Sequence, residues 1–220
     1  MIVSKRDHSK GGRPSLERAG EVDERILDAA EKIFLARGFE GASVDEIAQT
    51  ARAGKPTIYA RYPGKEQLFA AVMERRVARN TQFDNLPAQG RDLRAKLVNV
   101  GIALIEGALK EETIGLLRLA IAEARRFPEL TRRVNEMARK RAAQNLAKLL
   151  GELVREEGIA AEGAFAPDRI ADTARIFLDT VLFAMFIRRL MGEDVKSLRK
   201  ELPDHVRQRV DFFLTACGKG

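Results

Sequence analysis

Apolar residues recur every three or four positions along most of this chain, which is the spacing of one buried face of an α-helix. The first such stripe includes Val22, Ile26 and Ile33 and stops at Gly38, a residue type that commonly ends helices. No long segment shows another periodicity, so the chain is predicted to be all-α. The same spacing predicts further helices over residues 43–51, 55–62, 65–83, 91–108, 113–126, 128–157, 167–191 and 204–216.

The second and third predicted helices are short and only three residues apart. Ser43 and Glu46 have the spacing of a capping box, in which each side chain satisfies a backbone donor of the first turn. Residues 52–54 form the turn, and Pro56 stands in the first turn of the next helix, where its missing amide hydrogen costs nothing. The arrangement predicts a helix-turn-helix.

The outward face of this pair is basic. No acidic residue occurs from Ile47 to Lys65, while Thr57 and Tyr59 supply hydroxyl groups for phosphate oxygens or base edges. We therefore predict that the helix-turn-helix binds double-stranded DNA. A solvated helical hairpin without a nucleic-acid partner is the alternative, because short helical pairs are common.

Residues 38–68 resemble the DNA-binding domain of TetR-family transcriptional regulators. The resemblance implies an all-α fold with an N-terminal three-helix DNA-binding domain over residues 21–83, whose helix-turn-helix spans about 43–62. It also implies a C-terminal helical ligand-binding and dimerisation domain over residues 91–220. Residues 1–20 are expected to form a disordered N-terminal arm. The motifs that carry the resemblance are Gly38-Phe39, Ser43, Ile47-Ala48, Thr57-Ile58-Tyr59 and Lys65-Glu66.

The family's contact roles carry over to matching positions. By resemblance, Ser43, Tyr59, Arg61 and Lys65 would hold phosphates, and Arg52, Lys55, Pro56 and Thr57 would face the major groove. The aromatic ring of Tyr62 matches a position that more often lies in the core.

Two arginines need separate comment. Arg52 stands where the family usually has glycine, so either the backbone is shifted there or an ordinary side chain adopts the left-handed conformation at a cost of about 1 kcal/mol. Arg13, within a Gly-Arg-Pro stretch, is a candidate contact in the minor groove. A plain disordered tail explains that stretch equally well.

The stretch from Gly115 to Leu130 resembles the C-terminal domain of the AefR-like branch of TetR regulators, which implies binding of an unknown small-molecule effector. A run of basic residues over 125–141 is compatible with an acidic ligand, although a solvated helical face is the commoner reason for such a run. Apolar residues at helical spacing are also usually core. The candidate pocket residues are Leu104, Leu117, Ile121, Glu123, Arg126, Phe127, Met137, Phe177 and Met185.

The helix around residues 176–187 is apolar nearly all round, and the last helix has a second apolar face. Two such helices from each protomer would form an isologous four-helix interface of a homodimer. The alternative is that both faces belong to the core of a single chain. The candidate interface residues are Leu178, Leu182, Phe186, Val206, Val210 and Phe213.

Composition excludes several other classes of protein. The 220 residues are 45% hydrophobic and 32% charged with a net charge of +7, as in a soluble globular protein with a polyanionic partner. Cys217 is the one cysteine, and His8 and His205 are the only histidines, so we expect no disulfide, metal site, cofactor or histidine-based catalytic triad. No secretory signal or membrane span is evident, which predicts a cytoplasmic protein. The lack of a metal pair, a histidine-based triad and a phosphate loop predicts that the protein is not an enzyme.

Together these features predict a homodimeric, ligand-responsive transcriptional regulator that binds a palindromic operator, most simply a repressor. A transcriptional activator, a nucleoid-type DNA binder and a helical small-molecule-binding protein without a specific DNA target are the alternatives.

Overall fold

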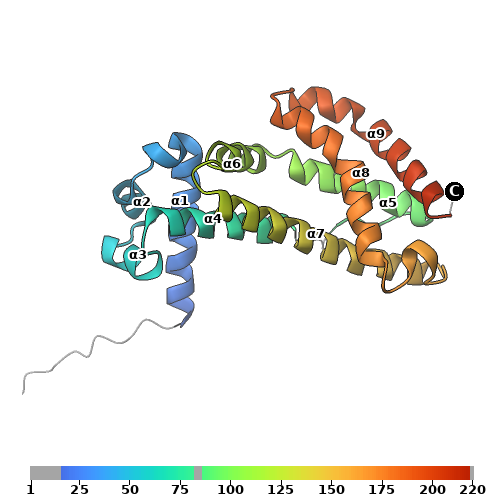
Figure 1. The fold of residues 1–220 in the computed structure, drawn as a ribbon, viewed down its shortest axis with the longest axis horizontal. Helices are drawn as coiled ribbons and strands as arrows, with labels where there is room; N and C mark the ends of the chain where they lie inside the picture. Colours follow the sequence, from blue (N-terminus) through green and yellow to red (C-terminus); the bar gives the residue numbers. More distant parts are fainter. Residues whose placement is uncertain (1–15, 82–85, 219–220) are drawn as a thin grey trace, which may run out of the picture. The chain divides into compact units, whose positions relative to one another are not determined.

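The computed structural model describes residues 16–81 and 86–218, and these contain nine α-helices, one short 3-10 helix and no strand (Figure 1). The predicted all-α fold is confirmed. The helices are α1 (Leu16–Gly41), α2 (Val44–Ala51), α3 (Lys55–Arg61), α4 (Lys65–Asn80), α5 (Leu93–Ala108), α6 (Glu111–Ala122), α7 (Pro128–Glu156), η1 (Gly163–Phe165), α8 (Ile170–Leu190) and α9 (Val195–Ala216).

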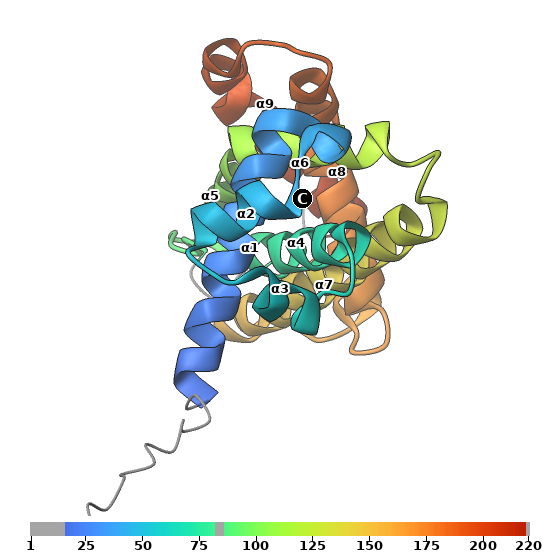
Figure 2. The same cartoon turned by 90° about the vertical axis from the view of Figure 1, so that its left-hand side faces the viewer.

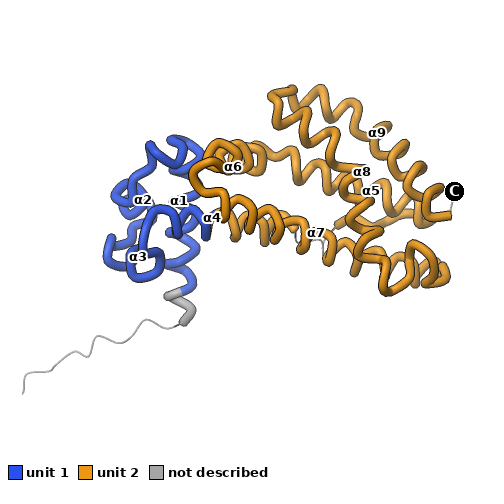
Figure 3. The backbone as a smooth tube through the Cα atoms, viewed as in Figure 1, with its two compact units in different colours: residues 1–72 blue, residues 73–220 orange. Residues whose placement is uncertain are grey.

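The chain divides into two compact units, residues 1–72 and 73–220 (Figure 3). In unit 1 the aromatic rings of Phe34, Phe39 and Phe69 form a buried cluster, with ring centroids 5.2–5.9 Å apart. Gly38 breaks α1 just before Phe39 with a φ of 69°, a value that glycine adopts without steric cost. This break turns Phe39 into the core, so the predicted helix end at Gly38 has a packing role.

Unit 2 is a bundle in which α5, α8 and α9 pack on one another and α7 packs on α8 (Figure 1). The Phe177 and Phe213 rings meet edge to face at 5.0 Å between α8 and α9. Gly101 lets α5 approach both helices, because a Cβ atom there would lie 2.8 Å from a γ-methyl group of Val206 and 3.3 Å from one of Val181. The core of this unit therefore depends on the absence of a side chain at residue 101.

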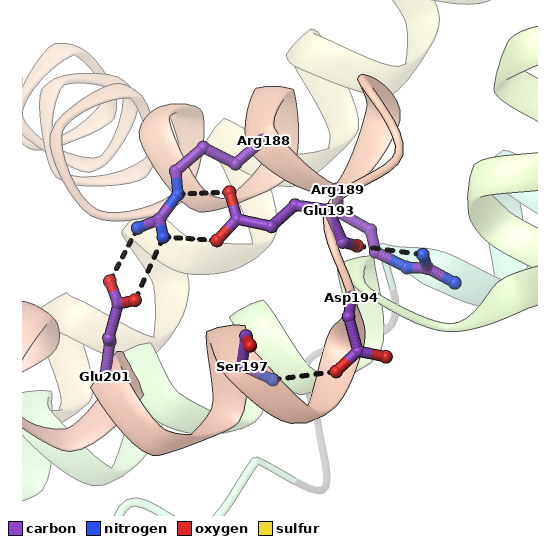
Figure 4. A network of polar contacts seen from close by, with 6 residues as sticks. All are labelled: Arg188, Arg189, Glu193, Asp194, Ser197 and Glu201. Atoms are coloured by element: carbon purple, nitrogen blue, oxygen red, sulfur yellow. Dashed lines mark hydrogen bonds and ion pairs between the residues drawn. The ribbon is translucent and has the colours of Figure 1, made fainter.

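A network of charged side chains joins the end of α8 to the start of α9 (Figure 4). The Arg188 guanidinium donates to both carboxylate oxygens of Glu193 and to both of Glu201, at 2.5–3.0 Å. These hydrogen bonds hold the pKa of Glu193 and of Glu201 below the usual range of a glutamate. Asp194 caps α9 by accepting from the Ser197 amide at 3.0 Å. The turn is thus fixed by charge-assisted hydrogen bonds.

Two boundaries differ from those expected. The units divide within α4, between Val72 and Met73, and not at the polar segment after residue 83. The second half of α4 belongs to unit 2, where Asn80 donates to the Thr113 hydroxyl at 3.3 Å. The last helix begins at Val195, not at Asp204, and contains Pro203. A proline inside a helix removes one backbone hydrogen bond, but the buried apolar face of α9 continues through it.

Candidate nucleic-acid interface and ligand cavity

The two helices of the predicted helix-turn-helix have the expected cap and turn, but only half of the capping box forms, because the Glu46 carboxylate accepts from Arg37 Nε at 2.8 Å and not from the Ser43 amide. Ser43 is the N-cap of α2, and its Oγ accepts from the Glu46 amide at 3.1 Å. The acceptor lone pairs are then in use while the hydroxyl hydrogen can still be donated to a phosphate. In α3 Pro56 stands in the first turn and Ile58 is buried at 1% exposure, which anchors the helix in unit 1. Helix α2 packs on α1 and on α3 (Figure 2).

The turn between α2 and α3 resolves the choice left open at Arg52. Its backbone is left-handed, with φ 51° and ψ 44°, and it is the one non-glycine residue with a positive φ in the described ranges. The Arg52 amide donates to the Gln49 carbonyl at 3.2 Å and the Ala53 amide to the Ala48 carbonyl at 3.0 Å. These two bonds form a Schellman motif. Arg52 therefore adopts the left-handed backbone that glycine would have in this turn, and it also places a guanidinium there.

Most of the residues predicted to contact DNA are exposed. Arg52, Lys55 and Pro56 are exposed, Thr57 is half-buried, and the Tyr59 side chain is 47% exposed. An exposed aromatic ring with a hydroxyl group is uncommon in a packed helical pair unless it has a partner. We name this set, Arg52, Lys55, Pro56, Thr57 and Tyr59, the recognition surface.

An acidic residue adjoins this surface. The Lys55 ammonium forms an ion pair with the Asp45 carboxylate of α2 at 2.6 Å, and both side chains are more than half exposed. Asp45 precedes the acid-free segment, so the sequence pattern alone did not connect it with Lys55. Any phosphate that binds Lys55 competes with this carboxylate.

Arg61 and Tyr62 share one partner on α1. The Arg61 Nε atom lies 3.3 Å from an Asp23 carboxylate oxygen, and the Tyr62 hydroxyl donates to that same oxygen at 2.9 Å. Both side chains are half-buried. Asp23 therefore orients Arg61, a predicted phosphate ligand. It also holds Tyr62 against α1, in agreement with the prediction that Tyr62 belongs to the core. Asp23 and Tyr62 are 39 positions apart in the chain, so the local sequence pattern could not predict this contact.

Lys65 has a set of contacts that the sequence did not predict. Its ammonium donates to the carbonyls of Glu40 at 3.3 Å and Ala42 at 3.1 Å and lies 4.6 Å from the centroid of the Phe39 ring. The Lys65 side chain thus caps carbonyl groups at the C-terminal end of α1. Phosphate binding would be a second role of this residue. Arg13, the candidate for the minor groove, lies outside the described residues.

Unit 2 contains a cavity of about 470 Å³. This volume lies in the range of small-molecule sites. Its apolar wall includes Leu104, Leu178, Leu182, Phe183 and Phe186. Five helices, α4, α5, α6, α7 and α8, contribute lining residues. The charged and polar lining residues are Arg79, Asn80, Thr81, Lys110, Thr113, Arg139, Arg175 and Asp179.

The residues that line this cavity differ from most of those predicted for the ligand pocket. Leu104 lines it, whereas Phe177 and Met185 are 0% and 1% exposed and belong to the bundle core. They lie on the side of α8 opposite to the wall, since neighbouring helix positions differ by about 100°. The remaining predicted residues do not line this cavity, and Ile121 is 53% exposed. These residues are Leu117, Ile121, Glu123, Arg126, Phe127 and Met137.

The predicted dimer residues also divide into two groups. Leu178, Leu182 and Phe186 line the cavity. Val206, Val210 and Phe213 are at most 2% exposed inside the core, so the prediction that they form an open apolar face is wrong for the single chain. The apolar stripe of α9 is covered by α5 and α8, which the sequence pattern could not reveal. The large apolar side chains that remain exposed on these helices are Ile176, Phe183 and Phe212.

Other chemistry is sparse in the described ranges. They contain no group of three or more His, Cys, Asp or Glu side chains placed to hold a metal ion. Burial raises the pKa of the Cys217 thiol, which disfavours the reactive thiolate. Among the described residues, no helix has the length and apolar character needed to cross a membrane.

Comparison with known proteins agrees with this geometry. A family model described as bacterial regulatory proteins of the tetR family matches residues 26–72. A second model, described as the C-terminal domain of AefR-like transcriptional repressors, matches residues 95–219. Both matches confirm the resemblance that the motifs indicated, and the matched proteins are regulators of transcription, not enzymes.

Individual relatives extend the comparison to most of the chain. The uncharacterized HTH-type transcriptional regulator YvkB of Bacillus subtilis is 25% identical over 82% of this chain and 89% of its own length. The HTH-type transcriptional activator FasR of Mycolicibacterium smegmatis is 39% identical over 31% of this chain and 30% of its own length. The crystal structure of a TetR-family regulator from Mesorhizobium loti superposes with a TM-score of 0.77 at 25% identity, covering 90% of this chain and 98% of the other.

Proposed function

The chain belongs to the TetR family of bacterial regulatory proteins, and from this premise we propose that it is a ligand-responsive repressor that binds a palindromic DNA operator as a homodimer. The observation that carries the proposal is the recognition surface. It combines two cations, two hydroxyl groups and an exposed aromatic ring on one helix-turn-helix. Such a surface supplies both phosphate contacts and groups for base edges. We place the protein in the cytoplasm because its DNA target lies there.

The chemistry of each side chain on the recognition surface indicates whether it would contact base edges or phosphates. Arg52 and Thr57 are suited to base edges, because a guanidinium matches the O6 and N7 atoms of guanine and a hydroxyl group can either donate or accept. Ser43 and Tyr59 would donate to phosphate oxygens. Lys55 would add a phosphate contact when it leaves Asp45.

A homodimer is supported by apolar side chains that the single chain leaves uncovered. Ile176 and Phe183 are 55% and 64% exposed on α8, and Phe212 is 69% exposed on α9. TetR-family regulators bind DNA and typically act as dimers. An isologous contact through these three residues would bury them and provide two DNA-binding units for two half-sites. It replaces the interface built on Val206, Val210 and Phe213.

Ligand control is supported by the course of α4. This helix begins at Lys65 in unit 1 with Phe69 in the aromatic core, and its last residues, Arg79 and Asn80, line the cavity of unit 2. A ligand that binds better to one position of α4 than to another changes DNA affinity by at most the ratio of its two affinities, provided that DNA also favours one of these positions. We propose that the bound effector favours the position with low DNA affinity.

Repression is favoured by the match of residues 95–219 to the C-terminal domain of AefR-like transcriptional repressors. FasR carries the name of an activator, so activation is the second candidate for the sign of regulation. A reporter gene under the protein's own upstream DNA separates the two. Deletion of the protein raises reporter expression for a repressor and lowers it for an activator.

Footprinting tests the proposal as a whole. Hydroxyl-radical protection of the protein's own upstream DNA should show two half-sites separated by about 10–10.5 base pairs or a multiple of this. Sedimentation of the same complex should give an even number of protomers. Lys55→Ala and Tyr59→Ala should each weaken protection, whereas Lys196→Ala, an exposed lysine of α9, should not. Uniform protection without half-sites, or a monomer on DNA, would contradict the proposal.

A further inference from the structure

The cavity of unit 2 has an apolar body and a cationic rim. Four cationic side chains line it, from Arg79, Lys110, Arg139 and Arg175, against a single acid, Asp179. Most ligand pockets are lined chiefly by apolar groups with a few polar ones that fix orientation. An excess of three positive charges is therefore an unusual feature of this site.

Two arginines of this rim come from the neighbouring helices α7 and α8. Arg139 of α7 and Arg175 of α8 line both the main cavity and a neighbouring surface hollow, so their side chains border the same region. Arg175 is paired with Asp172 at 3.0 Å and is about half exposed. Arg139 is exposed and forms no ion pair within the described part of the chain. One guanidinium is thus available without the loss of an existing partner.

The neutral polar groups of the cavity are already engaged. The Thr113 hydroxyl accepts from Arg76 and from Asn80, each at 3.3 Å. The Thr81 hydroxyl donates to the Val77 carbonyl at 2.8 Å. Among the cations of the lining, Arg139 is exposed and has no ion pair among the described residues, so it is open to a charged ligand. A ligand gains most here by bringing negative charge to the rim and apolar surface to the wall.

We propose that this cavity binds an amphipathic organic carboxylate, with its carboxylate at Arg139 and Arg175 and its apolar part against Leu104, Leu182 and Phe186. The inference rests on the proposed function, because it names the chemical class of the effector for the same site. A guanidinium matches a carboxylate with two parallel hydrogen bonds, a geometry that an amide or an ester cannot reproduce. The cavity volume of about 470 Å³ suits a compact drug-sized molecule.

Matched pairs of acids and amides test the charge requirement. The probes are 2-naphthoate, 4-phenylbutyrate and decanoate, each with its amide, titrated into the full-length protein in a calorimeter. At least one acid should bind, and it should bind at least about tenfold more tightly than its amide, as expected for a charge-assisted contact worth about 1.4 kcal/mol. Equal binding of acid and amide, or no binding of any acid, would overturn the proposal.

Variants locate the carboxylate. Arg139→Gln should weaken binding of the acid at least about tenfold and leave binding of the amide unchanged. Arg141→Gln is the matched control, because it removes the same charge from the same helix at an exposed position that does not line the cavity. Ala142→Phe, which places a ring in the cavity, should abolish binding of acid and amide alike. Equal acid affinity in Arg139→Gln and in the wild type would refute the assignment.

Failure of this inference can be told apart from failure of the proposed function. The same protein is assayed for binding to its upstream DNA without any probe. Specific DNA binding with no preference for acids over amides refutes the carboxylate alone. A clear preference for acids without specific DNA binding supports the cavity chemistry and contradicts the regulator. If both hold, the bound acid should also lower DNA affinity.

Discussion

The ion pair between Asp45 and Lys55 provides the sharpest prediction about DNA binding. The two charged groups are 2.6 Å apart, and their side chains are 60% and 52% exposed. In the proposed complex Lys55 must exchange this carboxylate for a phosphate. Asp45→Asn keeps the shape of the side chain and removes its charge, so it should raise DNA affinity.

The size of the effect follows from the exposure of the pair. An exposed ion pair is worth about 0.2–1 kcal/mol, which corresponds to a factor of about 1.4–5 in affinity for each DNA-binding unit. Two independent units in a dimer double the free energy and give roughly 2- to 30-fold. Because Lys55 contacts the same phosphate in both proteins, the slope of log K against log salt should stay close to that of the wild type.

Stability should change in the opposite direction. Asp45 lies in the first turn of α2, where a negative charge interacts favourably with the helix dipole. Asp45→Asn should therefore lower the free energy of unfolding by about 0.3–1 kcal/mol while DNA affinity increases. A general loss of structure would lower both quantities, so the two measurements separate a local effect from misfolding.

Fluorescence anisotropy of labelled upstream DNA across a salt series is the assay. Glu162→Gln is the control, because it changes the net charge by the same amount at an exposed position in unit 2. The control should leave both affinity and salt slope close to the wild type. If Asp45→Asn matches the control in affinity, or binds DNA more weakly than the wild type, then Lys55 does not contact phosphate and the competition argument is refuted.

Three further predictions concern the turn, the core and the charged network. Arg52→Gly should raise the free energy of unfolding by up to about 1 kcal/mol, because relief of the left-handed strain exceeds the extra chain entropy of glycine. The same substitution should weaken operator binding. Lower thermal stability of this variant would contradict the strain argument. Gly101→Val should lower the free energy of unfolding in urea by about 1–3 kcal/mol or more, because its Cβ would overlap a γ-methyl group of α9; an unchanged urea midpoint would show that the helices can separate freely. Because Arg188 lowers the pKa of Glu193 and of Glu201, its stabilising effect should be complete above the ordinary glutamate pKa near 4.5 and should fade below it. The melting temperatures of the wild type and of Arg188→Gln should therefore converge as the pH falls from 6 to 3, and a constant difference would argue against the network.

Local features of this fold were accessible from the sequence. The Ser43 cap of α2, the position of the turn at residues 52–54 and Pro56 in the first turn of α3 depend on residues only a few positions apart, and serine and proline have strong preferences for such places. The sequence left the backbone conformation of Arg52 open, and it did not predict the pairing of Glu46 with Arg37. The helical periodicity also located most helices. It missed the start of α9, because Pro203 looked like a boundary although the buried face continues across it.

The candidate sites depended on long-range packing, which periodicity does not encode. On α8 the sequence could not tell which side of a nearly uniform apolar helix faces the core. Phe177 was therefore assigned to the pocket and Leu182 to the interface, whereas Phe177 lies in the bundle core and Leu182 lines the cavity. The contact of Asp23 with Tyr62 joins two helices far apart in the chain. An apolar stripe such as that around Val210 predicts burial but not the partner that buries it.

The central claim is that this chain recognises one DNA sequence in preference to others. The most direct measurement is the affinity of the purified protein for its own upstream DNA and for random DNA of equal length, at physiological salt and across a salt series. We predict a ratio of at least about 10³ in favour of the upstream fragment, which Lys55→Ala and Tyr59→Ala should reduce. Equal, salt-sensitive affinity for both fragments would contradict operator recognition, and no binding at any salt would contradict DNA binding altogether.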